Sequence, residues 1–358
     1  MNFVSDNIVG ASAPVLQALV AANEGALPAY GLDPITKRVE ARFAEIFERD
    51  CAVYLVTTGT AANALALAAA VPPWGLAVCH RESHVIDDEC GAPEFFMHGA
   101  KLAGLPGAGG KLDPATVSAY LAGLPKALKQ MPPKALSISQ VTECGMVYTL
   151  DEIEALGGVC RERGLAFHLD GARFANALVS LGCTPAEMTW KRGVDIVSFG
   201  GTKNGCLMAE AVVVFDKRLD EGLDYRRKRA GQIISKGRLA AAQFEAYFEN
   251  DHWYANARHA NRMARQLSEG LAALPGVRLA WPTQANEVFP IIPKAMDRAL
   301  REAGALYHPW TEASLFEGEQ VAETESLIRL VLSFATREED VARFLDVARG
   351  AVRRAAAE

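Results

Sequence analysis

The sequence predicts an α/β fold: a mostly parallel central sheet with helices on both faces, followed by a small C-terminal α+β domain. Short apolar runs alternate with helical segments at the spacing of βαβ units, at residues 52–56, 76–79, 135–145, 165–170 and 195–200. Beyond a long expected helix over residues 237–274, further strand candidates follow at 277–280, 287–292 and 327–333. We therefore expect a large domain with its N-terminal segment over residues 1–248 and a small domain over residues 249–358.

Composition narrows the class of protein. The chain has 358 residues, 50% of them hydrophobic, and a net charge of -6, so it can bury a large core but has no basic excess for nucleic acid. The longest apolar stretch, residues 61–71, is too short to cross a bilayer, and residues 1–7 lack the basic start of a secretory signal. Seven scattered cysteines without a Cys-x-x-Cys pair favour reduced thiols in a cytoplasmic protein over disulfides or a zinc site, and we predict no metal site.

The N-terminal segment, residues 1–32, is rich in turn-forming residues and is expected to be irregular. Such a segment can wrap over another part of the protein or over a neighbouring subunit, or it can be a loose terminus. A helix is expected to begin at Asp33 and Pro34, because aspartate is a good N-cap and proline is favoured in the first turn.

A candidate phosphate site follows the first strand. Residues 52–56 end in a Gly/Thr turn that leads directly into the alanine-rich helix 61–70. Free backbone N–H groups at a helix start bind anions, so Thr58, Gly59 and Thr60 could hold a phosphate; a threonine N-cap over a buried helix explains the same residues. Residues 104–111 resemble a P-loop but do not match its pattern, and no Gly-x-Gly-x-x-Gly follows a strand. Both observations make nucleotide binding an unfavourable interpretation.

Two other segments bring polar residues to the same edge of the predicted sheet. His84 lies in a polar loop that leads into a helix, where an imidazole could stack on a planar ring and exchange protons, or could simply lie on the surface. The run 135–145 turns polar at its end and carries Gln140, Thr142 and Glu143 to this edge.

Asp170 and Lys203 each follow an apolar run, so both are expected at the carboxyl edge of the sheet. This pair suits pyridoxal phosphate, whose pyridine nitrogen is kept protonated by an aspartate while a lysine holds its aldehyde as a Schiff base. Each residue also has an ordinary explanation, as a helix N-cap after a turn for Asp170 and as a solvated loop residue for Lys203.

The rest of the chain adds three features. Residues 209–215 follow the lysine loop so closely that they must return as an antiparallel strand. Residues 223–231 form a basic cluster that is either a solvated helix face or a source of cations for a phosphate. Arg329 lies in an apolar strand and needs a partner, for which a substrate carboxylate is one candidate.

In their order and spacing these motifs resemble the threonine aldolase family of pyridoxal-phosphate enzymes, which has the aspartate-aminotransferase type of fold (fold type I). The resemblance covers nearly the whole chain and rests on Ser5-Asp6, Tyr30-Gly31, Thr58-Gly59-Thr60, His84, Glu89-x-Gly-Ala, His168 to Arg173, Lys203 and Arg329-Leu-Val331.

The resemblance implies a role for each matching residue. The residue matching Lys203 forms the Schiff base, the one matching Asp170 pairs with the pyridine nitrogen, and the one matching His84 stacks on the ring. The cofactor phosphate is assigned to Thr58, Gly59 and Thr60, the cofactor oxygen and the amino-acid carboxylate to Ser5, Arg173 and Arg329, and a further substrate contact to Tyr30. Family members are typically tetramers whose sites are completed across an interface, which would involve the N-terminal segment and the cluster from Arg226 to Arg229.

One position departs from the commoner branch of the family. That branch has a Glu-Asn-Thr-His run where this chain has Gln140-Val-Thr-Glu143, so a histidine near the substrate hydroxyl is replaced by Glu143. This resembles a smaller branch that acts on β-hydroxy amino acids including phenylserine. The identity of the base, His84 or Glu143, and the preferred substrate stay open at this point.

The expected reaction is retro-aldol cleavage of L-threonine, L-allo-threonine or a related β-hydroxy-α-amino acid to glycine and an aldehyde, by a cytoplasmic homo-oligomer with no nucleic-acid or membrane partner. The alternatives are a β-eliminating lyase or an aminotransferase on the same scaffold and, from another class, a non-catalytic homologue that retains the fold.

Overall fold

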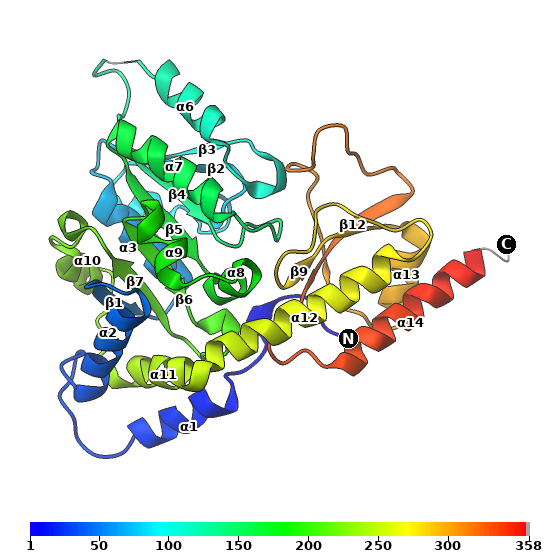
Figure 1. Ribbon diagram of the computed structural model, residues 1–358, viewed down its shortest axis with the longest axis horizontal. Coiled ribbons are helices and arrows are strands. Elements are labelled where there is room, and N and C mark those ends of the chain that lie inside the picture. Colours follow the sequence, from blue (N-terminus) through cyan, green and yellow to red (C-terminus); the bar gives the residue numbers. More distant parts are fainter. Residues whose placement is uncertain (126, 356–358) are drawn as a thin grey trace.

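The computed structural model describes residues 1–125 and 127–355 (Figure 1). Its large domain is built on a seven-stranded sheet with the strand order β1-β7-β6-β5-β4-β2-β3. The strands are β1 (Ala52–Val56), β2 (Leu76–His80), β3 (Lys101–Leu105), β4 (Pro133–Ser139), β5 (Ala166–Gly171), β6 (Ile196–Gly200) and β7 (Glu210–Val214). Strands β2 to β6 pair in parallel, whereas β7 pairs antiparallel with both β6 and β1. The predicted mostly parallel sheet and its antiparallel return after the lysine loop are confirmed.

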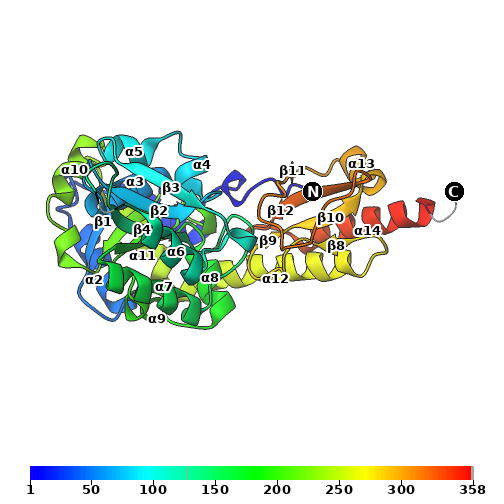
Figure 2. The same cartoon turned by 90° about the horizontal axis from the view of Figure 1, so that it is seen from above.

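Helices cover both faces of this sheet, as predicted (Figures 1 and 2). One face packs against the group α2 (Pro34–Ile46), α6 (Pro114–Gly123), α7 (Leu150–Arg163), α8 (Phe174–Leu181), α9 (Pro185–Met188) and α11 (Arg238–Phe248). The other packs against α3 (Gly59–Ala70), α4 (His84–Asp87) and α10 (Leu223–Arg229), with α5 (Ala92–Phe96) beside α3. The predicted helix start at Asp33 and Pro34 is confirmed: Asp33 caps α2 by accepting a hydrogen bond from the Thr36 N–H (2.9 Å).

The small domain has its own core and an antiparallel sheet. Strands β8 (Arg278–Leu279), β9 (Glu287–Val288), β10 (Pro290–Pro293), β11 (His308–Pro309) and β12 (Glu325–Val331) pack against α12 (His252–Ala272), α13 (Lys294–Glu302) and α14 (Glu338–Ala355). The three predicted strand regions are present, and the two-residue strand β11 was not predicted.

The predicted boundary between residues 248 and 249 falls at the short turn between α11 and α12, and the division itself stays a prediction. Two parts of the chain connect the cores: Phe3 lies in the small-domain core, where its backbone bonds to Leu306 and Val331, and α12 contributes Trp253 to one core and Met263 to the other. In Figure 2 the N-terminus accordingly lies beside the small domain.

Two expectations about local structure were wrong. Residues 1–32 are not uniformly irregular, because α1 (Ala13–Ala22) forms and packs along α11. The long helix expected over residues 237–274 is broken at Glu249–Asp251, where Asn250 and Asp251 adopt positive φ values of 50° and 55°. The break lets the aromatic rings of Phe248 and Trp253 pack together in one core, with their centroids 5.3 Å apart.

Candidate active site

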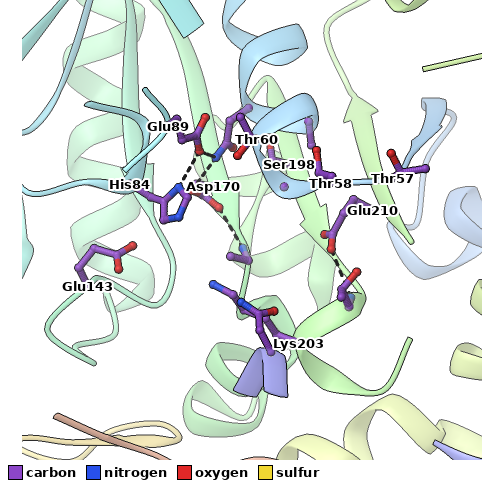
Figure 3. Close-up of a pocket in the computed structure, with 16 residues that line it drawn as sticks. Thr57, Thr58, Thr60, His84, Glu89, Glu143, Asp170, Ser198, Lys203 and Glu210 are labelled. Carbon is purple, nitrogen blue, oxygen red and sulfur yellow. Dashed lines mark hydrogen bonds and ion pairs between the residues drawn. The ribbon is translucent and has the colours of Figure 1, made fainter. Parts of the chain in front are cut away.

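Asp170 and Lys203 line a single cavity of about 270 Å³ at the carboxyl edge of the large sheet (Figure 3). Asp170 lies near the end of β5, and Lys203 lies in the short turn Thr202–Asn204 that follows β6. These two strands are neighbours in parallel register, with Asp170 opposite Ser198. The structure therefore brings the two strand-end residues to one place, as the sequence pattern led us to expect.

The two glycines before Lys203 are required by close backbone approach. A Cβ atom at Gly200 would lie 2.6 Å from the carbonyl oxygen of Ala172, and one at Gly201 would lie 2.7 Å from that of Ala209. Contacts this short are essentially absent from proteins. Glycine at 200 therefore lets β6 pass the turn that follows Asp170, and glycine at 201 lets the lysine turn pass the residue just before β7. The glycines thus place Lys203 against the end of the neighbouring strand.

Asp170 is fixed by two hydrogen-bond donors and buried, with 5% of its surface exposed. Its Oδ2 accepts a hydrogen bond from the side-chain amide of Asn63 (2.9 Å), and its Oδ1 accepts one from the backbone N–H of Ala172 (3.0 Å). Asn63 was not predicted as a site residue. Its signal was visible as the one strongly polar side chain within the apolar helix 61–70.

His84 belongs to the same hydrogen-bond network. Its Nδ1 donates to Glu89 Oε1 (2.8 Å), which also accepts from the Asn63 amide (2.8 Å), as the dashed lines in Figure 3 show. The hydrogen bond with Glu89 raises the pKa of His84; burial opposes this, while the negative charges of Asp170 and Glu143 add to it. Because Nδ1 is engaged, Nε2 is the ring nitrogen available to a ligand, and Glu143 lines the same cavity.

The Gly/Thr turn forms the opposite part of the cavity wall. Thr58 caps α3, its hydroxyl accepting a hydrogen bond from the Ala61 N–H (3.1 Å), and Thr58, Gly59 and Thr60 all line the cavity. A Cβ atom at Gly59 would meet no atom within 4 Å, so the glycine faces open space. The threonine cap is therefore present. The first backbone N–H groups of the helix stay available to an anion, and phosphate binding there stays a prediction.

Arg173 is buried in an ion-pair cluster instead of facing the cavity. Its guanidinium donates to both carboxylate oxygens of Asp6 (2.8 and 3.1 Å), and its Nη1 lies 3.3 Å from Glu287 Oε2. Burial lowers the pKa of Arg173, but the two carboxylates outweigh it and raise the pKa above its ordinary value. Burial raises the pKa of Glu287 to about 7, against the opposing charges of Arg173 and Arg329. No local sequence pattern indicated that Glu287 joins this cluster.

Like Arg173, three further predicted substrate residues lie outside the cavity wall. The Ser5 hydroxyl accepts a hydrogen bond from the N–H of Asn7, which does line the cavity. Arg329 donates to the Val4 carbonyl (3.4 Å), and its guanidinium lies 4.6 Å from the centre of the Trp310 ring. Tyr30 is 55% exposed and belongs to a separate hollow beside α2 and β1. Their roles toward substrate stay predictions.

The residues of the cavity fit pyridoxal phosphate. The open cradle at Gly59 suits a phosphate, the Asp170 carboxylate held by two donors suits a protonated pyridine nitrogen, and the Lys203 amine suits an aldehyde. Among the described residues, no group of three or more histidine, cysteine, aspartate or glutamate side chains is placed to hold a metal ion. Within the same part of the chain, no helix is both long and apolar enough to span a membrane.

Comparison with known proteins decides the family. Residues 2–293 match the model of the beta-eliminating lyase family. The chain belongs to this family. Pyridoxal phosphate is the cofactor of the family, in agreement with the donor set of the cavity.

Individual relatives match over most of their length. The low specificity L-threonine aldolase of a Pseudomonas species is 44% identical over 307 residues, covering 84% of this chain and 87% of the relative. That of Pseudomonas aeruginosa is 44% identical over 302 residues, with the same shares covered. Among solved structures, the threonine aldolase of Leishmania major superposes with a TM-score of 0.90 at 31% identity, covering 98% of this chain and 99% of the other.

Proposed function

We propose that this protein cleaves β-hydroxy-α-amino acids, such as L-threonine, L-allo-threonine or phenylserine, to glycine and an aldehyde with the help of pyridoxal phosphate. One observation carries the proposal: Asp170 and Lys203, from adjacent parallel strands, line one cavity together with the His84–Glu89 pair. The two Pseudomonas relatives, both named low specificity L-threonine aldolase, support the reaction type.

Pyridoxal phosphate, when bound, supplies an aldehyde for covalent attachment and a ring that accepts the electrons of the bond broken at Cα. Lys203 provides the amine that holds the aldehyde. Asp170 holds a proton at the pyridine nitrogen, and its orientation is set by Asn63 and the Ala172 N–H. The α3 start, with Gly59 open to the cavity, binds the phosphate.

His84 is the best-placed base for the β-hydroxyl proton. Its Nδ1 is engaged by Glu89, which fixes the ring and leaves Nε2 to accept a proton, the arrangement of a base and its orienting carboxylate. Glu143 also lines the cavity, but within the part of the chain that the structure describes its side chain makes no hydrogen bond that would orient it.

The pH profile of Glu89→Gln tests this assignment. The hydrogen bond with Glu89 raises the pKa of His84, so His84 is protonated and inactive as a base at low pH, and kcat/KM rises as the pH rises through that pKa. In Glu89→Gln the pKa of His84 falls, and the acid limb of kcat/KM should move to lower pH. Glu143→Gln is the matched control and should move the limb less, because its charge adds a smaller effect. If the acid limb of kcat/KM stays at its wild-type pH in Glu89→Gln, His84 is not the titrating base.

Incubation with L-threonine tests the reaction itself. We expect acetaldehyde and glycine in equal amounts, measured by aldehyde reduction with a coupled dehydrogenase and by amino-acid analysis. Formation of 2-oxobutanoate and ammonia instead would establish β-elimination, and a keto acid formed only when an amino acceptor is added would establish transamination.

We further propose a cytoplasmic homotetramer whose active sites are completed across an interface. Tyr30, Leu32 and Tyr225 are 55%, 70% and 80% exposed, and Leu207 and Met208, which follow the lysine turn, are 46% and 53% exposed. Exposed apolar side chains of this kind are typical of a surface that another subunit covers. All seven cysteines are free, as expected of a protein in a reducing compartment.

A further inference from the structure

Glu210 is a buried carboxyl group in the cavity wall for which the proposed reaction has no use. It is the first residue of β7, is 7% exposed, and lies opposite Val56 of β1 and Gly200 of β6 in the sheet register. It is therefore flanked by the strand that leads to the Gly/Thr turn and by the strand that leads to Lys203 (Figure 3). Its Oε1 accepts a long hydrogen bond from the Thr202 N–H (3.3 Å).

The charges around Glu210 offer it little compensation. Lys203 is the cation that acts on it, and Cys206 and Tyr247 are the neighbouring groups that can titrate. The other ionisable side chains of the cavity wall are His84 and the acids Glu89, Glu143 and Asp170; among the described residues no arginine lines it. Burial raises the pKa of Glu210 to about 7, although hydrogen bonds from Thr202 and Gly201 and the charge of Lys203 oppose this.

A phosphate in the adjoining cradle would change the charge that Glu210 can carry. A phosphate monoester bears up to two negative charges near neutral pH. An ionised Glu210 beside it would repel it, whereas a protonated Glu210 could donate a hydrogen bond to a phosphate oxygen. The backbone N–H groups at the start of α3 are neutral donors and cannot neutralise both charges.

We propose that Glu210 is part of the phosphate site and takes up a proton when the cofactor phosphate binds, donating it in a hydrogen bond to a phosphate oxygen. The inference rests on the cofactor assignment and adds that cofactor affinity is coupled to pH. Below the pKa of Glu210 the proton is already present and affinity does not change. Above it, each binding event takes one proton from solvent, and the dissociation constant rises by about tenfold per pH unit.

Calorimetric titration of the apoprotein with pyridoxine 5'-phosphate tests the proposal. This probe carries the ring and the phosphate but no aldehyde, so the covalent bond with Lys203 does not contribute. We expect the ratio of the dissociation constants of wild type and Glu210→Gln to rise about tenfold or more from about pH 6 to about pH 9. Titration at about pH 8 in buffers of different ionisation enthalpy should show up to one more proton taken up by wild type than by the variant.

Two controls separate the phosphate from the rest of the site. With pyridoxine, which lacks the phosphate, the ratio should not depend on pH. Glu245→Gln, the same substitution at a surface residue that pairs with Arg38 and does not line the cavity, should bind pyridoxine 5'-phosphate with the pH dependence of wild type. A pH-independent ratio would overturn the role of Glu210. The absence of proton uptake by wild type at about pH 8 would also overturn it, and this measurement does not need the variant to fold. A wild type that fails to bind the probe at every pH would overturn the cofactor assignment as well.

Discussion

Lys203→Ala is expected to lower kcat/KM for β-hydroxy amino-acid cleavage by about 10³-fold or more, because it removes the amine that the proposed mechanism attaches to the cofactor. Turnover is measured by aldehyde release from L-threonine or phenylserine with saturating pyridoxal phosphate. The phosphate cradle and Asp170 lie on other elements, so the variant should still bind the cofactor without a covalent bond.

Lys191→Ala is the matched control for this experiment. Lys191 pairs with Glu48 at the surface, 2.6 Å apart, and does not line the cavity. Its substitution should leave kcat/KM within about twofold of wild type, since an exposed ion pair contributes little to the stability of the fold. A Lys203→Ala enzyme that keeps near-normal turnover would contradict the assignment of the lysine.

Asp170→Asn is expected to lower kcat by about 10²- to 10³-fold, the usual cost of removing a preorganised electrostatic partner of the transition state. The amide is close in shape to the carboxylate but cannot hold a proton on the pyridine nitrogen by charge, so the ring accepts electrons less readily. Single-turnover kinetics with bound cofactor measure the effect on the bond-breaking step separately from binding.

Asp195→Asn is the matched control for this experiment. It makes the same chemical change just before the start of the adjacent strand β6, at the edge of the sheet away from the cavity. The Asp195 carboxylate accepts a hydrogen bond from the Phe167 N–H (2.9 Å), one residue before β6 begins. Its substitution should lower stability while leaving kcat of the folded enzyme nearly unchanged. Equal losses of kcat in the two variants would show that Asp170 acts only through the fold.

Much of the site was predictable because each side chain follows a local pattern. Asp170 and Lys203 follow apolar runs that form neighbouring strands, and Thr58 to Thr60 begin a helix that directly follows a strand. Position along the chain alone then brings these residues to the same sheet edge. The same logic placed Glu143 and His84 in the cavity wall.

The unpredicted parts depend on contacts between distant segments. Glu287 reaches Arg173 across the two cores, and Asp6 reaches it from the N-terminal segment, so neither pairing is visible in a local pattern. The helix break at Asn250 contains no glycine or proline, so no helix-breaking residue marks it in the sequence. The break lets Phe248 and Trp253 pack in one core, and asparagine tolerates the left-handed backbone that the break needs. The helix α1 had a visible signal in Ser12 and Pro14, a serine N-cap with proline in the first turn.

Borohydride reduction of the cofactor-loaded protein, followed by peptide mass spectrometry, tests the central claim most directly. The account predicts that the reduced pyridoxyl phosphate group is found on the peptide containing Lys203 and is absent from Lys203→Ala. A label on a different lysine, or no label in a protein that has bound the cofactor, would contradict it.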